Sequence, residues 1–403
     1  MNDIAETIRE AQAFLAAHWS PDVDPNEWRE HVVDARWAAL RWPSRWFGRD
    51  LADEDAKRVE AVFAAAGAPG PGQDVYNLWA GTMIAYGSDA LKEQFMRPLL
   101  LDEVAMCLLY SEPGAGSDLA GVRATAVRDG EEWIVNGQKV WTSGAREADY
   151  GMLIARTDWD QTKHRGITFF WFPMRQPGVK VRPLRQATGD ARFNEVFITD
   201  ARVPDSHRIG DLNQGWWVLQ TALAYERATM GVSRRGSARG PTGATAAAHG
   251  HIPTPDISLL ALARDVGGAQ EPAMRQQLMR LYSMRMVNDW NGERAKALAK
   301  AGGSSPLASL GKLAMAIILH FAGHVQGELL GIEATLDGDL NARARDHNYS
   351  QLNAYFFSIG GGTDQIQRNI IGERILGLPR EPEVDREVPF RLVSSSGGTP
   401  RST

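Results

Sequence analysis

Two short segments of this 403-residue chain carry the residue types that bind a flat, charged ligand. YSEPGAGSDLAG at 110–121 places two hydroxyl side chains, Ser111 and Ser117, around Pro and Gly, and NGQKVWTSGA at 136–145 carries Trp141. Backbone N–H groups of a glycine-rich loop approach an anionic or carbonyl-rich ligand closely because no Cβ intervenes. An indole ring supplies a flat wall. A single such loop is commonly a turn, but the pair of segments favours a binding site.

Composition narrows the class of protein. The chain is 43% hydrophobic and 23% charged with a net charge of −5, which is typical of a globular protein with about two or three domains. Nucleic-acid binders usually present a basic face, so the composition predicts no nucleic-acid partner. The single cysteine, Cys107, excludes an internal disulfide and, with a charged N-terminal segment unlike a signal peptide, predicts a cytoplasmic location.

The periodicity of apolar residues changes twice along the chain. Amphipathic helical patterns occupy the N-terminal part, strand patterns follow, and helical patterns return from Gly215. Asp129-Gly130 and Asn136-Gly137 are predicted as tight turns between strands. There is no βαβ rhythm, so a nicotinamide-binding Rossmann domain is not expected. The apolar tract 307–331 has helical spacing and contains Lys312, so we expect a bundle helix and no membrane contact.

Two further segments strengthen a family resemblance. DARVPDSHRIGDLNQGWWVL at 200–219 and GGTDQIQRNIIGERILGLP at 361–379, with the two segments above, resemble the acyl-CoA dehydrogenase family over about 3–385. The resemblance implies an α+β fold with an N-terminal all-α domain, a middle β-sheet or barrel domain and a C-terminal four-helix bundle. The corresponding boundaries are 1–107, 108–212 and 213–385, followed by a flexible tail at 386–403.

The same resemblance implies FAD as cofactor, an acyl-CoA thioester as substrate and an electron-transfer flavoprotein as the acceptor of electrons. In this chemistry a carboxylate removes a proton from the carbon next to the thioester, and a hydride leaves the next carbon for the flavin. The thioester arm is assigned to Ser117 and Arg227. The flavin contacts are assigned to Leu109, Tyr110, Ser111, Gly116, Trp141, Ser143, Thr363 and Gln365.

The catalytic base departs from the common pattern of the family. Most members carry a Glu directly before the Gly-Thr of the final signature, where this chain has Gly361. Members that take long or branched substrates place the base before an Arg on the first bundle helix, which matches Glu226-Arg227. We therefore assign the base to Glu226, whose burial should raise its pKa. The alternative is a plain helix residue that faces solvent or pairs with an Arg.

Gly361 still supplies a backbone N–H for the thioester oxygen, since that role needs no side chain. The missing carboxylate enlarges the space beside the flavin, so the sequence predicts a bulky, branched or steroid-side-chain acyl group. The simpler interpretation of the Gly run is a turn before a helix that is capped by Thr363. Both interpretations are compatible.

The family's contacts from a neighbouring subunit to the far end of the cofactor are not recognisable here. The segments RAKALAKAGGSSP and QGELLGIEATLDG, near 295–305 and 326–338, lack the expected Arg, Phe and Gln-Gly-Gly. Bacterial relatives that act on steroid side-chain thioesters form two-chain assemblies with the complete site at the mixed interface. The resemblance therefore implies a homotetramer or a heterotetramer, including an α2β2 arrangement.

Two other readings remain open. The chain could be a partner subunit without a complete active site, or a flavin monooxygenase of the same superfamily, which typically lacks the base. His320, His324 and Glu328 share one helix face at a spacing that could hold a metal. Within a bundle helix of this family we interpret them as a polar seam, with no metal.

Overall fold

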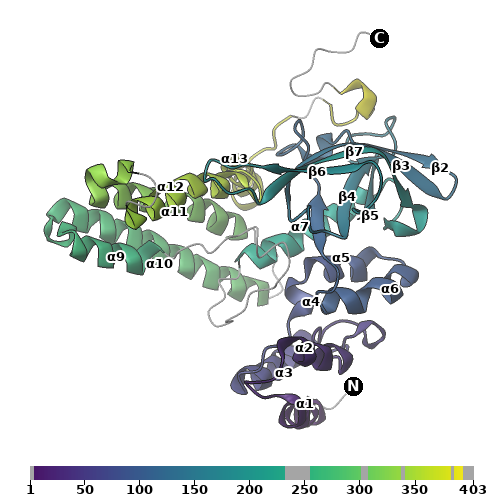
Figure 1. Cartoon of the computed structure of the whole chain (residues 1–403), viewed down its shortest axis with the longest axis horizontal. Coiled ribbons are helices and arrows are strands. Elements are labelled where there is room, and N and C mark those ends of the chain that lie inside the picture. The colour runs from purple at the N-terminus through teal and green to yellow at the C-terminus, as the bar shows by residue number, and fades with distance from the viewer. Residues whose placement is uncertain (1–3, 232–254, 301–306, 337–340, 383–384, 394–403) are drawn as a thin grey trace. The chain divides into compact units, whose positions relative to one another are not determined.

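The computed structural model describes residues 4–231, 255–300, 307–336, 341–382 and 385–393. The chain divides into two compact units (Figure 1). The first contains residues 1–184, 191–248 and 384–403, and the second contains 185–190 and 249–383. Each unit is described separately. The expected three-domain boundaries stay a prediction.

The first unit begins with six helices, and capping side chains mark the starts of three of them. Asp24 accepts hydrogen bonds from two backbone N–H groups at the start of α2, and Ser88 accepts one at the start of α6. Thr7, Ala11 and Leu15 form the buried stripe of α1. The helices are α1 (Ile4–His18), α2 (Pro25–Asp34), α3 (Asp53–Ala65), α4 (Gln73–Tyr76), α5 (Leu78–Tyr86) and α6 (Asp89–Leu100).

A single mixed sheet follows, with the strand order β6-β7-β3-β2-β4-β5-β8 and with β1 beside β4. Most neighbours are antiparallel, whereas β1 and β4 run parallel. The strands are β1 (Met106–Leu109), β2 (Thr125–Asp129), β3 (Glu132–Ser143), β4 (Tyr150–Arg156), β5 (Ile167–Pro173), β6 (Val179–Leu184), β7 (Phe193–Pro204) and β8 (Arg208–Ile209). Such a sheet has no doubly wound arrangement, as the sequence predicted.

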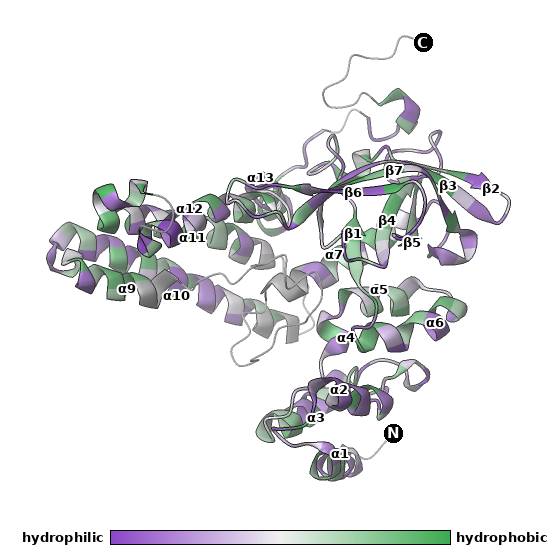
Figure 2. Cartoon of the chain, in the orientation of Figure 1, coloured by the Kyte–Doolittle hydropathy of each residue, from purple (hydrophilic) through white to green (hydrophobic). Residues whose placement is uncertain are grey.

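The sheet's apolar faces form the centre of the first unit. Strands β4 and β5 are buried along most of their length and are coloured as hydrophobic in Figure 2. Because both faces of these strands are covered, they read as continuous apolar runs without alternation. Cys107 on β1 is 1% exposed, and burial raises the pKa of its thiol. This cysteine is therefore part of the core of the β domain.

One predicted turn is wrong. Asp129-Gly130 does connect β2 to β3, and Gly130 has a φ of 60°. Asn136-Gly137 lies inside β3 instead, at a bulge opposite β7. A Cβ on Gly137 would stand 2.5 Å from the Cβ of Ala124, so close approach of the backbones explains this glycine. The Asn136 amide exchanges two hydrogen bonds with Asp200, which stabilises the bulge.

Helices return with α7 (Gly215–Gly231), which packs against α5 and β5 of the first unit. The second unit contains α9 (Pro255–Asp265), α10 (Pro272–Lys300), α11 (Leu307–Leu330), α12 (Ala342–Ile359) and α13 (Asp364–Ile370). Helix α11 packs against both α10 and α12. One helical stretch, Ser309–Thr335, is long and apolar enough to span a membrane, but these contacts are those of a bundle helix. The expected α+β fold is confirmed.

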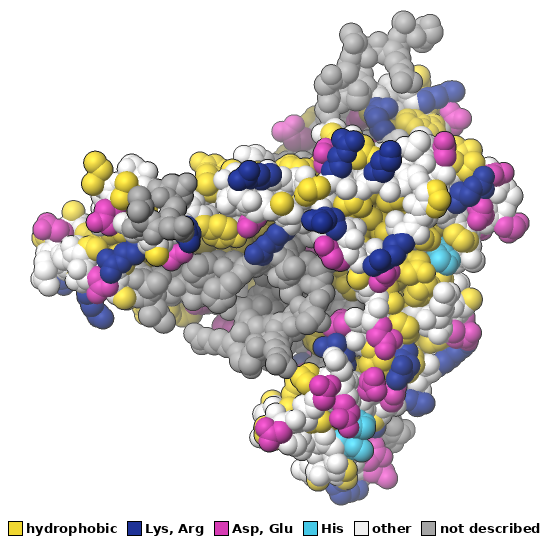
Figure 3. All heavy atoms as spheres, viewed as in Figure 1, with side chains coloured by type: hydrophobic (Ala, Val, Ile, Leu, Met, Phe, Trp, Pro, Cys, Tyr) yellow, Lys and Arg dark blue, Asp and Glu magenta, His cyan; other side chains and the backbone are white. Residues whose placement is uncertain are grey.

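The chain returns to the first unit at its C-terminal end. Residues 385–393 lie against the β domain, and Phe390 in a short 3₁₀ turn is 1% exposed. The predicted flexible tail therefore does not start at 386, because the buried Phe390 side chain holds residues 385–393 against the β domain. The remainder, 394–403, and the connection 232–254 lie outside the described residues. Acidic and basic side chains are mixed over the face in Figure 3, in line with a net charge of −5.

A buried ion pair includes a lysine on β3, an inner strand of the sheet. The Lys139 side chain on β3 is fully buried, and its Nζ lies 2.8 Å from Glu112 Oε1. Glu112 also accepts hydrogen bonds from the backbone N–H groups of Arg123 and Ala124. Burial lowers the pKa of Lys139, and the Glu112 charge opposes that shift. The attraction between the two ions therefore offsets part of the free-energy cost of removing each of them from water.

We expect Lys139→Met to destabilise the protein by about 3–5 kcal/mol, because it leaves the Glu112 carboxylate buried without a cation. Arg202→Met is the matched control, since Arg202 pairs with Asp129 and Glu132 on the half-exposed surface of the same sheet. The loss of stability in Arg202→Met should be much smaller, because exposed ions are already solvated. Urea unfolding followed by fluorescence measures both, and equal losses would contradict the role given to Lys139.

Candidate active site

Trp141 stands at an irregular point of β3. Its φ is 62°, in the left-handed region that bulky residues rarely adopt, and it sits at a break in the register with β7. The side chain is 56% exposed and meets the Phe193 ring edge-on at 5.9 Å. A strained backbone that turns a large aromatic ring outward is a common feature of ligand sites. The geometry supports the predicted flat wall.

The segment Leu109–Ser111 lies beside β3, and its backbone, not its first two side chains, is available to a ligand. The Leu109 side chain is fully buried, and Tyr110 is 6% exposed with its hydroxyl 3.6 Å from Met152 Sδ. Val140 N–H donates to Ser111 O at 2.9 Å, and Lys139 Nζ donates to Tyr110 O at 3.1 Å. These bonds fix Leu109–Ser111 alongside Trp141. Any ligand contact of Leu109 and Tyr110 therefore comes from their backbone.

The Gly-rich loop, residues 112–124, leaves room over its backbone. A Cβ added at Gly116 would meet no atom within 4 Å, so the chain itself does not require glycine there. Ser117 is exposed, and Ser111 and Ser143 are half-buried. Open backbone, hydroxyl groups and an exposed indole suit a planar ring with polar edges. The residues present therefore fit a flavin.

Helix α7 carries the proposed base and is fixed tightly to its neighbours. A Cβ on Gly81 of α5 would lie 2.6 Å from the Tyr225 ring, so only glycine lets the two helices approach this closely. The Thr221 and Tyr86 hydroxyls are 3.1 Å apart. The start of the helix at Gly215 lies against the β5 backbone in the same close manner. These contacts hold the position of Glu226.

Glu226 acts electrostatically on the segment beside the predicted flavin site. Burial raises the pKa of the Tyr110 phenol well above its usual value, and the Glu226 charge raises it further. The second effect requires the carboxylate to lie near Tyr110 in a region of low dielectric. The Glu226 side chain is half-buried. The Glu226 charge thus influences the phenol that precedes Ser111 in the chain, while the roles of Glu226 and Arg227 stay predictions.

The final signature lies in the second unit, between α12 and α13. Gly361 and Gly362 both have positive φ, 67° and 90°, so two successive residues turn through the left-handed region. Gln367 Nε2 donates to Gly361 O at 3.0 Å and closes the turn. The Thr363 hydroxyl accepts from Ile366 N–H as the N-cap of α13. The predicted turn and cap are confirmed.

The predicted flavin contacts of Thr363 and Gln365 concern the start of α13. Gln365 is exposed on the first turn of this helix, next to Asp364, which pairs with Lys312 at 3.2 Å. The Thr363 hydroxyl is already used as the cap, so a ligand there meets backbone N–H groups first. Both contacts stay predictions.

Three charged residues that support the site escaped the sequence reasoning. Glu112, Lys139 and Arg156 lie around the Gly-rich loop, and Arg156 and Lys139 are fully buried. One signal was present, because Lys139 interrupts the strand pattern directly before Val140 and Trp141. A buried lysine needs a partner, but strand periodicity does not identify it.

The two histidines on α11 contact neighbouring side chains. His320 Nε2 lies 2.9 Å from Ser358 Oγ, and His324 Nε2 lies 3.1 Å from Glu328 Oε1. The Tyr355 ring meets His320 edge-on at 4.8 Å. The His320 contacts join α11 to α12, while the His324–Glu328 pair lies within α11, and both suit the polar seam that the sequence predicted.

Comparison with known proteins gives consistent matches. The family profile described as the acyl-CoA dehydrogenase middle domain matches residues 107–201. The acyl-CoA dehydrogenase IpdE1 of Mycobacterium tuberculosis is 34% identical over 88% of this chain and 88% of its own length. FadE34 of the same organism is 35% identical over 94% of this chain, which spans about half of FadE34 (50%). The crystal structure of the ChsE4-ChsE5 complex, also from that organism, matches with a TM-score of 0.65 and 30% identity, over 94% of this chain and 99% of that one.

The chain belongs to the acyl-CoA dehydrogenase family, a family of oxidoreductases. The resemblance inferred from the sequence segments is therefore confirmed.

Gly116→Ala tests the predicted flavin contact. The added methyl group meets no atom of the chain, so stability should stay constant or rise by about 0.4–1 kcal/mol. Flavin affinity should fall by about tenfold or more if the ring lies against this backbone. Fluorescence titration of the flavin-free protein with FAD measures the affinity. Gly292→Ala in α10 is the control, since a Cβ added there also meets no atom within 4 Å. Equal flavin affinity of the wild type and both variants would show that Gly116 does not contact the flavin.

Proposed function

We propose that this chain is a catalytic subunit of an FAD-dependent acyl-CoA dehydrogenase for bulky thioesters. The observations behind the proposal are that Ser111, Trp141 and Glu226 belong to the same unit and that the Glu226 charge helps to raise the pKa of the buried Tyr110 phenol. Family membership supplies the reaction class. A carboxylate near the flavin-facing segment is what removal of a proton beside a flavin requires.

The proposed roles follow the needs of the reaction. Glu226 takes the proton from the carbon next to the thioester carbonyl, and the Gly361 N–H donates to the carbonyl oxygen as negative charge develops there. Bound FAD supplies the acceptor for the hydride from the adjacent carbon. Ser111, Gly116, Trp141 and Ser143 hold the ring, while Ser117 and Arg227 bind the thioester arm. An electron-transfer flavoprotein is the proposed final electron acceptor.

The proposed substrate carries rings or branches on its acyl chain. Gly361 has no side chain where most family members place a carboxylate, so a wide acyl group finds more space beside the flavin. The resemblance of the sequence to bacterial members of the family that act on steroid side-chain thioesters supports the same substrate class. A steroid side chain is therefore the proposed class of acyl group.

The proposed assembly is a tetramer in the cytoplasm, with a second type of subunit. The solved relative ChsE4-ChsE5 is a complex of two chains. This chain also lacks recognisable family contacts to the far end of the cofactor near 295–305 and 326–338. A partner chain would then complete the FAD site. The competing proposal, a subunit without its own active site, predicts that flavin reduction by the complex does not depend on Glu226 of this chain.

Glu226→Gln should lower the rate of flavin reduction by acyl-CoA at least about 100-fold, because the amide cannot accept the proton. Bound flavin and unfolding temperature should stay constant, since Gln has nearly the same size. Glu131→Gln removes the same charge from an exposed turn and is the control. Stopped-flow absorbance of the flavin measures the rate, with the partner chain present where flavin binding needs it. A rate near that of the wild type would exclude Glu226 as the base.

Substrate shape tests the open position at 361. The wild type should prefer an α-branched or steroid-side-chain acyl-CoA over octanoyl- and palmitoyl-CoA by about 10–200-fold in kcat/KM. Gly361→Glu should reduce this preference. Its control is Gly361→Ala, which carries the same strain at a φ of 67°, about 1–2 kcal/mol, without the carboxylate. A tenfold preference of the wild type for straight chains would contradict the proposed substrate class.

A further inference from the structure

The end of the described chain forms a strap over the β domain. We name residues 385–393 the C-terminal strap. Phe390 N–H donates to Gln161 O at 2.9 Å, and Arg391 N–H donates to Trp159 O at 3.0 Å. The strap thus bonds to the loop that joins β4 to β5 through its backbone. A segment with these bonds has one defined path along the domain.

Phe390 is the anchor of the strap. It is 1% exposed, and its ring centre lies 3.6 Å from the guanidinium carbon of Arg156 and 5.5 Å from the Trp159 ring. Arg156 is fully buried, and burial lowers its pKa to about 10, so the group still carries its charge at neutral pH. A ring face over a buried cation offsets part of its lost hydration.

The same guanidinium holds the Gly-rich loop. Arg156 Nη2 donates to Ala120 O at 2.7 Å and to Val122 O at 3.2 Å, and Nη1 donates to Lys163 O at 2.8 Å. One side chain therefore connects three segments, namely the Gly-rich loop, the β4–β5 loop and, through Phe390, the strap. Loss of the ring would expose one face of this connection to water.

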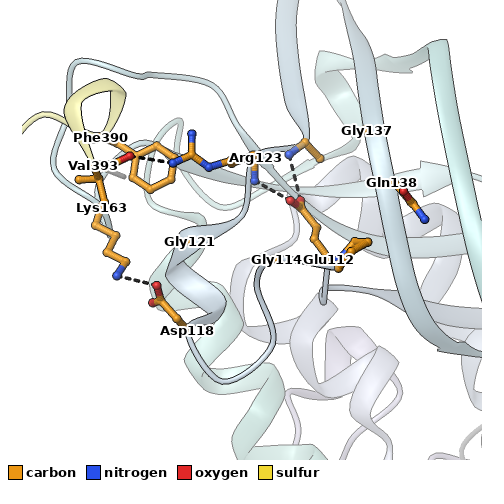
Figure 4. A pocket seen from close by; sticks show the side chains of 12 residues that line it. Glu112, Gly114, Asp118, Gly121, Arg123, Gly137, Gln138, Lys163, Phe390 and Val393 are labelled. Carbon is orange, nitrogen blue, oxygen red and sulfur yellow. Dashed lines mark hydrogen bonds and ion pairs between the residues drawn. The ribbon is translucent and has the colours of Figure 1, made fainter. Parts of the chain in front are cut away.

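A second set of contacts repeats the connection. Arg123 of the Gly-rich loop donates to Val393 O at 2.8 Å, and Lys163 pairs with Asp118 at 2.7 Å and with Asp385 at 3.8 Å. Figure 4 shows Arg123, Val393, Lys163 and Asp118 around a cavity of about 220 Å³. The cavity is lined by the Gly-rich loop, β3, Lys163 and two strap residues, Phe390 and Val393.

We propose that the C-terminal strap is a positioning element for substrate, and that Phe390 holds the Gly-rich loop in the conformation that binds the thioester arm at Ser117. The inference rests on the proposed function for the identity of the ligand. The loop is rich in glycine and its Ser117 is exposed, so the contacts from Arg156 and from the strap add to the loop's own hydrogen bonds in setting its conformation. A loop that is already ordered binds its ligand without the cost of ordering.

Phe390→Ala should raise KM for the acyl-CoA about tenfold, as expected if only a tenth of the molecules keep a competent loop. At saturating FAD and substrate, kcat should change by less than about twofold, because substrate binding then selects the competent loop. Phe390→Leu keeps an apolar side chain without the ring, so its KM should lie between those of the wild type and of Phe390→Ala. This variant remains informative if the Ala variant does not fold. Leu392→Ala is the control, since Leu392 belongs to the same strap and is 61% exposed. An unchanged KM in a folded Phe390 variant overturns the proposal.

Hydrogen exchange separates this inference from the proposed function. Measured without substrate, the backbone amides of 119–124 should exchange at least about tenfold faster in the Phe390 variants and at the wild-type rate in Leu392→Ala. Unchanged exchange overturns the ordering role of the strap. A wild-type protein that no acyl-CoA reduces would overturn the proposed function, while the exchange comparison still decides whether the strap orders the loop.

Discussion

Removing the Glu112 carboxylate from water is the constraint on which the rest of the site depends. Its oxygens accept from Lys139 Nζ and from the backbone of Arg123 and Ala124, so one group ties together β3 and both ends of the Gly-rich loop. Lys139 also bonds to the carbonyl of Tyr110. The ion pair thus anchors β3 two residues before Trp141, and through Tyr110 O it bonds the Leu109–Ser111 segment to the same strand. Buried ions of this kind specify one arrangement because every alternative leaves a charge unpaired.

Much of the fold and part of the site follow from local sequence. Strand and helix periods, with Gly and Pro punctuation, predict the order of helices, sheet and helices, and the structure agrees. Ser111 and Trp141 could be proposed, and the cap Thr363 was found, because each belongs to a short segment with a recognisable local pattern. The Asp129-Gly130 turn was found for the same reason. Local signals suffice where a residue and its effect are close in sequence.

The remainder depends on partners that are far apart along the chain. Asn136-Gly137 has the composition of a turn, and only the approach of Ala124 shows that it belongs to a bulge. The segment around Phe390 has the composition of a tail, yet the cation Arg156 that holds its ring lies on β4. No periodicity or spacing connects such pairs, because tertiary packing and charge select them. Glu226 lies between these two cases. The Glu-Arg motif suggests its role from the sequence, but its effect on Tyr110 could be known only from the fold.

The path of the strap fixes where the chain leaves the protein. Val393 is bound by Arg123 beside the Gly-rich loop, so whatever follows begins its path at the β domain and not at the end of α13. A group attached there through a short linker stays at high effective concentration around that loop. An affinity tag or a fluorescent reporter at the C-terminus will therefore sample the surroundings of the cavity. The same addition before α1 begins its path from the N-terminal helices instead.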